Sequence, residues 1–220
     1  MSAAAASASN HLLPSKHPIL QTRTITAPIT DIAPIHAVVE THRVAMLKMF
    51  SAMQPYVCAD ETRHGLNRVH VEVHDEKHMI LIATDGSTAA ALAVEFFEPH
   101  GIKEGCVGLT SASVKAFVVS KGYAPFAACP EGEDFPWLRN VVSLVPRPYA
   151  GVFGVNPNYF ARMATAMKKL GYGTTSPVRV ENGEDQFAPI LATANEETVG
   201  DKTASVVVKP MFITMPMRLE

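Results

Sequence analysis

The sequence predicts an α+β fold in which helices pack on one face of antiparallel sheets. Two observations lead to this class. Apolar segments of strand length follow one another through short polar links typical of hairpins, and segments with apolar residues at helical spacing stand between these groups. With 220 residues, 47% of them hydrophobic and 18% charged, the chain is expected to be globular and long enough for one domain or two small ones.

The elements recur in a unit of one strand, one helix and two or three further strands. In the first copy we expect a strand at residues 35–39 and a helix over about 40–53, where Val44, Leu47 and Phe50 recur at helical spacing. A polar turn at 74–77 separates the first two of the strands that follow. These strands are expected at 68–73, 78–83 and 89–97.

The second copy is abbreviated. A strand at 105–109 precedes a helix that Thr110 or Ser111 caps and Gly122 ends. One strand-like segment, 123–129, follows it.

The third copy is the clearest. A strand at 151–155 leads to Asn156 and Pro157, a typical helix start, and Gly171 ends the helix. The helix places Phe160, Met163, Met167 and Leu170 on one face and Arg162, Thr165 and Lys169 on another. The remaining strands are expected at 177–181, 187–194 and 204–215.

Composition narrows the class of protein. The net charge of −2 excludes a strongly basic protein of histone type, although a local basic stripe can still contact nucleic acid. Three widely spaced cysteines, Cys58, Cys106 and Cys129, fit a reducing cytoplasm without a disulfide framework. No apolar run approaches the roughly 20 residues that cross a bilayer, and the Ala/Ser-rich start does not resemble a secretory signal. We therefore expect a cytoplasmic protein without membrane contact, with a flexible tail at residues 1–34.

Several segments together resemble one family, the bacterial sliding clamp (DNA polymerase III beta subunit). "ADETRHGLNRVHVEV" and "ILIATDGSTAAALAV" (59–73 and 80–94) resemble the middle part of that protein. "EDFPWLRNVVSLVP" (133–146) is similar to its loop between the second and third domains, and "FGVNPNYFARMATAM" to the helix of its last domain. The ending "FITMPMRL" matches the family's Met-Pro-Met-Arg-Leu terminus and is the most specific of these motifs.

The resemblance implies a sliding-clamp fold and a family-specific partner site, a surface pocket into which replication and repair proteins insert a short apolar peptide. The residues that match this pocket are Arg63, Leu66, Thr84, Gly86, Ser87, Thr88, Ala89, Ile213, Met215, Pro216, Met217, Arg218 and Leu219. Methionine adapts to several apolar anchors, and Arg63 or Arg218 can hold a peptide backbone or carboxylate. The alternative is that Met215 and Met217 simply fill a core.

The family also encircles duplex DNA, with helices lining the hole and basic side chains facing phosphates. The matching candidates in this chain are Arg43, Lys48, Lys115, Lys121, Arg162, Lys168 and Lys169. Such contacts are independent of sequence and sensitive to salt. The alternative is that these side chains form ordinary solvated helix faces.

The chain also departs from the family. A family subunit is far longer, the His-Arg pair that follows its Thr-Asp-Gly is Ser87-Thr88 here, and its next Leu is Ala89. Glu220 extends one residue past the usual end. Such a compact variant would suit a virus or mobile element.

Residue patterns typical of an enzyme are missing. His70, Glu72 and His74 would share one face of a strand, but an extended strand separates the two histidines by about 13 Å, so no metal is expected. Asp85 in "TDG" is interpreted as a turn residue. The chain has no Gly-rich phosphate loop, Cys-x-x-Cys pair or Gly-x-Ser-x-Gly elbow, so we expect neither a catalytic residue nor a cofactor.

From these observations we expect a clamp-like domain at 35–148 and a C-terminal clamp-like half-domain at 149–220. The leading hypothesis is a non-catalytic DNA clamp, a processivity factor that surrounds double-stranded DNA as a homo-oligomer and binds a polymerase through the C-terminal pocket. The alternative is a clamp-derived adaptor or regulator that binds such peptides without encircling DNA.

Overall fold

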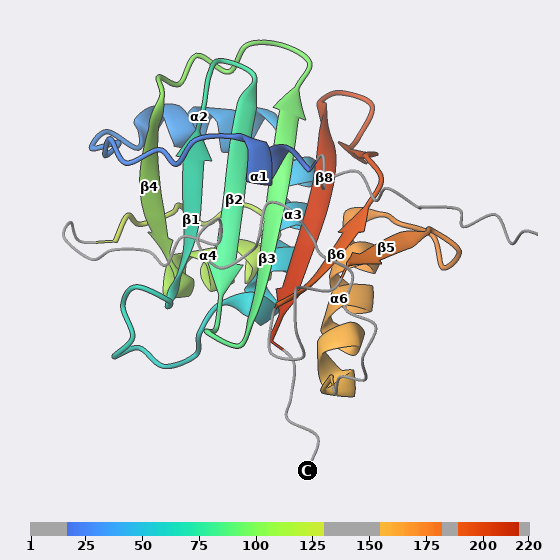
Figure 1. Ribbon diagram of the computed structural model, residues 1–220. Helices are drawn as coiled ribbons and strands as arrows, with labels where there is room; N and C mark the ends of the chain where they lie inside the picture. Colours follow the sequence, from blue (N-terminus) through green and yellow to red (C-terminus); the bar gives the residue numbers. More distant parts are fainter. Residues whose placement is uncertain (1–16, 130–154, 182–188, 216–220) are drawn as a thin grey trace, which may run out of the picture.

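The structure is a computed structural model that describes residues 17–129, 155–181 and 189–215 (Figure 1). Its helices in these ranges are α1 (Pro18–Gln21), α2 (Ala33–Thr41), α3 (Arg43–Met53), the 3-10 turn η1 (Gln54–Tyr56), α4 (Ser111–Val119) and α6 (Pro157–Leu170). Its strands are β1 (Arg68–Val73), β2 (His78–Thr84), β3 (Thr88–Phe96), β4 (Gly105–Thr110), β5 (Val178–Glu181), β6 (Ile190–Ala194), β7 (Glu197–Gly200) and β8 (Ser205–Thr214).

All these strands belong to one antiparallel sheet. Its order is β4-β1-β2-β3-β8-β6-β5, and β7 pairs with β8 beside this path. The central pairing of β3 with β8 places Ala91 opposite Met211. Segments that we assigned from the sequence to two domains, 35–148 and 149–220, therefore contribute neighbouring strands to the same sheet.

Four helices cover one face of this sheet and form the larger core. In Figure 1, α2 and α3 lie behind the strands, and the buried residues of α3, α4 and α6 join those of the sheet in one cluster. Phe50 of α3 contacts Phe117 of α4, with ring centroids 5.7 Å apart. The predicted α+β class, with helices on one face of an antiparallel sheet, is confirmed.

An N-terminal segment, residues 17–30, crosses the opposite face of the sheet, and we call it the strap (Figure 1, blue). It includes α1, whose Ile19 is fully buried against Ile80, Ile82 and Met211. At the far end of the strap, the N–H of Ile29 donates to the carbonyl of Cys106, 2.7 Å away. The prediction of a flexible tail is therefore wrong for residues 17–34.

Local sequence signals explain the best-predicted elements. The side chain of Asn156 accepts a hydrogen bond from the N–H of Asn158, Pro157 follows it, and Gly171 ends α6 with a φ of 105°. In the β1–β2 turn, Asp75 accepts from the N–H groups of Lys77 and His78.

Other expectations are wrong. Residues 35–39 form part of α2 rather than a strand, because Ile35, Val38 and Val39 recur at helical spacing and are buried together. Residues 123–129 contribute only an isolated bridge between Ala128 and Leu109. The short strand β7 was not anticipated. The predicted strand at 151–155 and the loop at 133–146 lie mostly or wholly outside the described residues.

Candidate partner-binding site

The turn between β2 and β3 is the centre of the candidate site. Asp85 organises it, because its Oδ1 accepts from the N–H groups of Ser87 and Thr88, at 2.9 and 2.7 Å. The hydroxyl of Thr84 donates to the carbonyl of Thr88, and the N–H of Gly86 donates to that hydroxyl. Gly86 has a φ of 93°, a conformation that favours glycine. The "TDGST" sequence thus forms a closed polar turn.

Two residues of the preceding loop lie against this turn. A Cβ placed on Gly86 would be 3.1 Å from a terminal nitrogen of Arg63 and 3.6 Å from a methyl carbon of Leu66. The loop is held by its own turn, in which the N–H of Leu66 donates to the carbonyl of Arg63. Arg63 is exposed, so its guanidinium is available at the surface.

The end of β8 completes the group. Ala89 pairs with Ile213, Thr88 pairs with Thr214, and the N–H of Met215 donates to the carbonyl of Ser87 at 3.1 Å. The predicted pocket residues that the structure describes therefore meet at one end of the sheet. The remaining four, Pro216, Met217, Arg218 and Leu219, lie outside the described residues.

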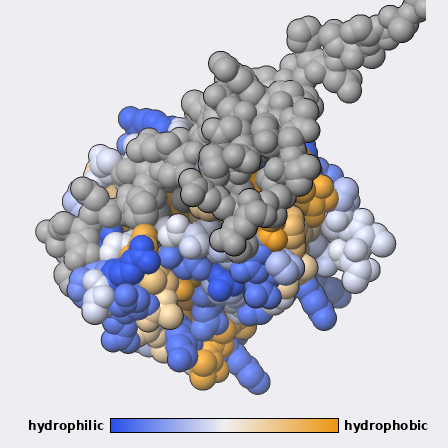
Figure 2. Space-filling model, turned by 60° about the horizontal axis from the view of Figure 1, so that its bottom comes forward, coloured by the Kyte–Doolittle hydropathy of each residue, from blue (hydrophilic) through white to orange (hydrophobic). Residues whose placement is uncertain are grey.

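Burial divides this group into a floor and a rim. The floor is buried and consists of Thr84, Thr88, Ala89 and Ile213. The rim is reached by solvent and consists of Arg63, Leu66, Gly86, Ser87 and Met215, the last 38% exposed. Figure 2 views the molecule with its lower end turned forward, and hydrophobic and hydrophilic surfaces alternate over the residues that it colours. The arrangement offers a partner apolar contact beside hydrogen-bonding groups.

Helix α6 reaches the same turn through Arg162. Its guanidinium lies 2.7 Å from Oδ2 of Asp85 and 3.3 Å from the hydroxyl of Thr88. Burial of Asp85 favours its neutral form, but hydrogen bonds from Thr88, Ser87 and Arg162 outweigh it and hold its pKa below the usual range. Arg162, which the sequence placed among the DNA contacts, is therefore also a structural partner of the candidate site.

A small apolar cavity of about 20 Å³ lies between α6 and the sheet, beside Thr88 and Ile213. Its other walls include Tyr56, Tyr159, Phe160 and Met163, none of which the sequence assigned to the site. The hydroxyl of Tyr56 is buried without a hydrogen-bond partner among the described residues, and burial raises its pKa. The sequence signal that could have identified α6 as a wall is the apolar face predicted for this helix, which contains Phe160 and Met163.

The other DNA-contact candidates differ in how far they are engaged within the chain. Arg43 stacks on the ring of Tyr123 at 4.4 Å, Lys48 donates to the carbonyl of Gly200, and Lys169 donates to that of Ser51. Lys115, Lys121 and Lys168 are exposed. Their role in DNA binding stays a prediction.

Within the described ranges, no group of three or more His, Cys, Asp or Glu side chains is arranged to hold a metal ion. His74 lies 2.9 Å from the buried carboxylate of Glu72, and His70 lies 3.9 Å from it. None of the described helices is long and apolar enough to cross a membrane.

No protein-family model and no curated protein sequence matches the chain. Solved structures do match. A Helicobacter pylori beta clamp in complex with diflunisal aligns with a TM-score of 0.56 and 10% identity over 89% of this chain and 65% of that one. A DnaN sliding clamp (DNA polymerase III subunit beta) from Pseudomonas aeruginosa, bound to griselimycin, aligns at 0.55 and 12% over 81% and 64%.

A DNA polymerase sliding clamp from Bacillus subtilis aligns with a TM-score of 0.54 and 12% identity over 80% of this chain and 62% of that one. This chain thus spans less than two thirds of the length of these clamps. At such low identity the likeness concerns the fold alone. The chain has the α+β fold of bacterial sliding clamps.

Proposed function

We propose that this protein is a shortened sliding clamp, a non-catalytic processivity factor that surrounds double-stranded DNA as a homo-oligomer. In this proposal the helix layer faces the duplex, and the candidate site at the end of the sheet binds a short peptide of a polymerase or another replication protein. The clamp fold supports the proposal, together with the distribution of charge between the helices and the rest of the chain.

The distribution of charge is the observation that carries the proposal. Helices α2, α3, α4 and α6 contain six Lys or Arg residues and a single acidic residue, Glu40, although the whole chain has a net charge of −2. Positive charge is therefore concentrated on the elements that cover one face of the sheet. A surface of this kind attracts the phosphate backbone without reading sequence, and its affinity falls as salt rises.

In this proposal a closed ring is an assembly of several copies of the chain. The number of copies follows from a measured molecular mass.

A second candidate function is an adaptor that binds clamp-interacting peptides without surrounding DNA. Four of the seven basic residues proposed to contact DNA already make contacts within the chain, and this favours the adaptor. They are Arg43, Lys48, Arg162 and Lys169. The candidate partner site does not depend on a ring, because its described residues all come from one chain.

Two measurements separate these functions. Light scattering during size-exclusion chromatography gives the mass, and a monomer at micromolar concentration would exclude the ring. Retention on nicked circular DNA, followed by loss after the circle is cut, would show topological binding. Retention on linear and circular DNA alike would contradict it.

The DNA-facing surface is tested with K115Q/K168Q, which removes two exposed helix lysines, and a matched control, K103Q/K202Q, which removes two exposed loop lysines. In the first variant, the negative slope of log binding constant against log salt should decrease in magnitude by about 0.9 for each phosphate that the removed lysines neutralised. The control should keep the slope of the wild type. Equal slopes in the two variants would refute the helix-facing geometry.

The partner site is tested by deleting residues 215–220 and titrating a peptide from the polymerase of the same source. We expect binding to be lost in the deletion and kept in K115Q/K168Q. Unchanged binding by the deletion would refute the site.

A further inference from the structure

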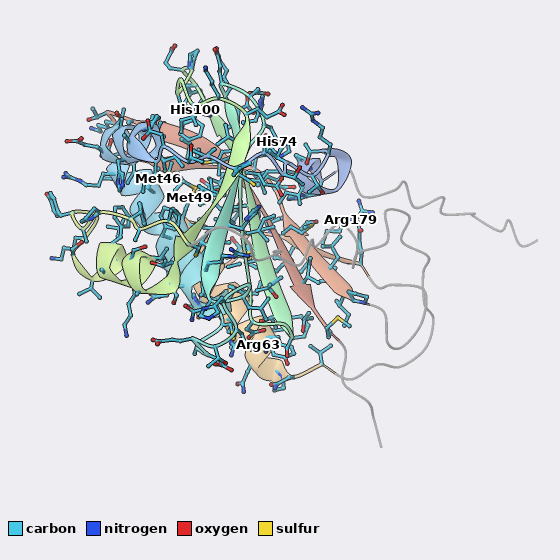
Figure 3. All side chains as sticks on the ribbon, turned by 90° about the vertical axis from the view of Figure 1, so that its left-hand side faces the viewer. Met46, Met49, Arg63, His74, His100 and Arg179 are labelled. Atoms are coloured by element: carbon cyan, nitrogen blue, oxygen red, sulfur yellow. The ribbon has the colours of Figure 1, made fainter. Side chains whose placement is uncertain are left out.

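A second hollow lies on the strap side of the sheet, opposite the helices. It has a volume of about 320 Å³, in the lower part of the range of small-molecule sites. It lies where β5, β6 and β8 run side by side next to the start of the strap. Figure 3 shows Arg179 of β5 on the side of the sheet that carries the strap, away from Met46 and Met49 of the helix layer.

Polar side chains form the floor of this hollow. Arg179 pairs with Thr193 across β5 and β6, and Asn195 and Lys209 follow in the next row. Further along the same face, Leu191, Met211 and Ile213 are apolar and buried with Ile19 of the strap. The change from apolar to polar residues therefore coincides with the hollow.

The cations on this floor keep donors that the chain does not use. Nε of Arg179 lies 2.5 Å from the carboxylate of Glu181, and its two Nη nitrogens make no hydrogen bond to the described residues. The ammonium of Lys209 lies 3.6 Å from Glu196, whose side chain is 64% exposed, so this ion pair is weak. Glu181 also lines the hollow and compensates Arg179, so the lining carries one net positive charge, that of Lys209, with Glu196 beside it.

One wall of the hollow is a neutral histidine. His17 is 2% exposed, its Nδ1 accepts from the N–H of Ile19, and its Nε2 donates to the carbonyl of Lys209 at 3.2 Å. Burial and the Lys209 charge lower its pKa to about 4. His17 is thereby fixed as a wall, and Pro177 adds apolar surface beside it. Val178 and Ala194 also border the hollow, but they pack with the core on the helix side of the sheet.

We propose that this hollow binds a small phosphate monoester. Lys209 and Arg179 supply charge-assisted donors for the terminal oxygens, and Thr193 and Asn195 supply neutral ones. A phosphate has three terminal oxygens for these four side chains, whereas a carboxylate has only two. The hollow is larger than a phosphate group, and the surface of Pro177 and His17 accommodates the organic part of the molecule. The site is on the face opposite the basic helices, so it is independent of the DNA-binding proposal.

The proposal is tested on the full chain by calorimetric titration with two probes, inorganic phosphate and adenosine monophosphate. The monoester should bind saturably and at least tenfold more tightly than inorganic phosphate. R179Q and K209Q should each weaken its binding at least tenfold, and K209R should keep most of it. The matched control K202Q, and K115Q/K168Q on the helix layer, should bind within twofold of the wild type. Circular dichroism and the melting temperature of each variant verify the fold.

Three results would overturn the proposal. The wild type shows no saturable binding of the monoester, or K209Q binds it as tightly as the wild type, or both probes bind with equal affinity. Loss of DNA binding in R179Q or K209Q would show instead that the cations of this face contact nucleic acid.

Discussion

Replacing Asp85 by alanine should lower the free energy of unfolding by about 3 kcal/mol. The carboxylate accepts hydrogen bonds from two backbone N–H groups, from the hydroxyl of Thr88 and from Arg162. A hydrogen bond to a charged group contributes about 1.5–3 kcal/mol when it is well buried. The turn is half-buried and the Arg162 side chain is 39% exposed, so solvent screening reduces each of the four contributions to less than about 1 kcal/mol, and their sum is about 3 kcal/mol.

Asparagine at the same position separates the turn from the ion pair. Its side-chain oxygen can still accept from Ser87 and Thr88, whereas the charge that faces Arg162 is lost. We therefore expect D85N to cost about 1 kcal/mol, clearly less than D85A.

The effect of Asp85 should depend on pH. Its pKa in the folded chain lies below its ordinary value, so its stabilising contribution is complete above the unfolded value of about 4 and is lost as the pH falls through the folded pKa. The difference in stability between the wild type and D85N should therefore shrink below pH about 4.

Urea denaturation followed by circular dichroism measures these differences at pH 7 and at pH 3.5. For a chain of this size, 1 kcal/mol corresponds to a shift of about 2–4 °C in melting temperature. If D85A unfolds within about 0.5 kcal/mol of the wild type, Asp85 does not organise the turn as described, and the geometry of the candidate site is refuted.

Three further predictions concern other parts of the chain. The pKa of His17 is about 4 in the folded chain against an ordinary 6.5, so the unfolded chain takes up a proton first as the pH falls. The free energy of unfolding should therefore fall by up to about 3 kcal/mol between pH 6.5 and 4. H17Q should flatten this pH dependence, as measured by urea denaturation. N156A removes the cap of α6 and should lower the unfolding free energy by about 1 kcal/mol, whereas N158A, which keeps the backbone donor, should change it by less than half of that. Y56F should leave stability unchanged or raise it by up to about 1 kcal/mol, because the buried hydroxyl has no partner in the described structure; a loss above 1 kcal/mol would reveal a hydrogen bond.

Elements with strong local signals could be predicted from the sequence. The alternation of "RVHVEV" and the polar residues after it define β1 and its turn, and Asn156, Pro157 and Gly171 define both ends of α6. The strap and the helix at residues 33–41 could not be predicted in this way. Ile19 and Leu20 are only a two-residue apolar pair before a polar segment, and Ile35, Val38 and Val39 fit a short strand as readily as one helical face.

The arrangement of the site depends on contacts between distant segments, which local patterns do not encode. The pairing of β3 with β8 joins residues more than one hundred positions apart, and it is this pairing that brings Met215 to Ser87. The resemblance to the clamp family placed these residues in one group. It gave no indication of the cavity walls Tyr56 and Tyr159, because tyrosines that line a cavity have no sequence pattern of their own.

Arg162 connects the two surfaces on which the proposed function depends. Its helix belongs to the basic layer, while its guanidinium is bound to the Asp85 turn of the partner site. Because Asp85 compensates its charge, Arg162 contributes less to an attraction for phosphates than Lys115 or Lys168, both exposed. The same ion pair links α6 to the turn, in addition to the buried residues Met167 and Leu170 that pack the helix into the core. DNA binding by this chain should accordingly depend on its exposed helix lysines, and partner binding on the Asp85–Arg162 pair.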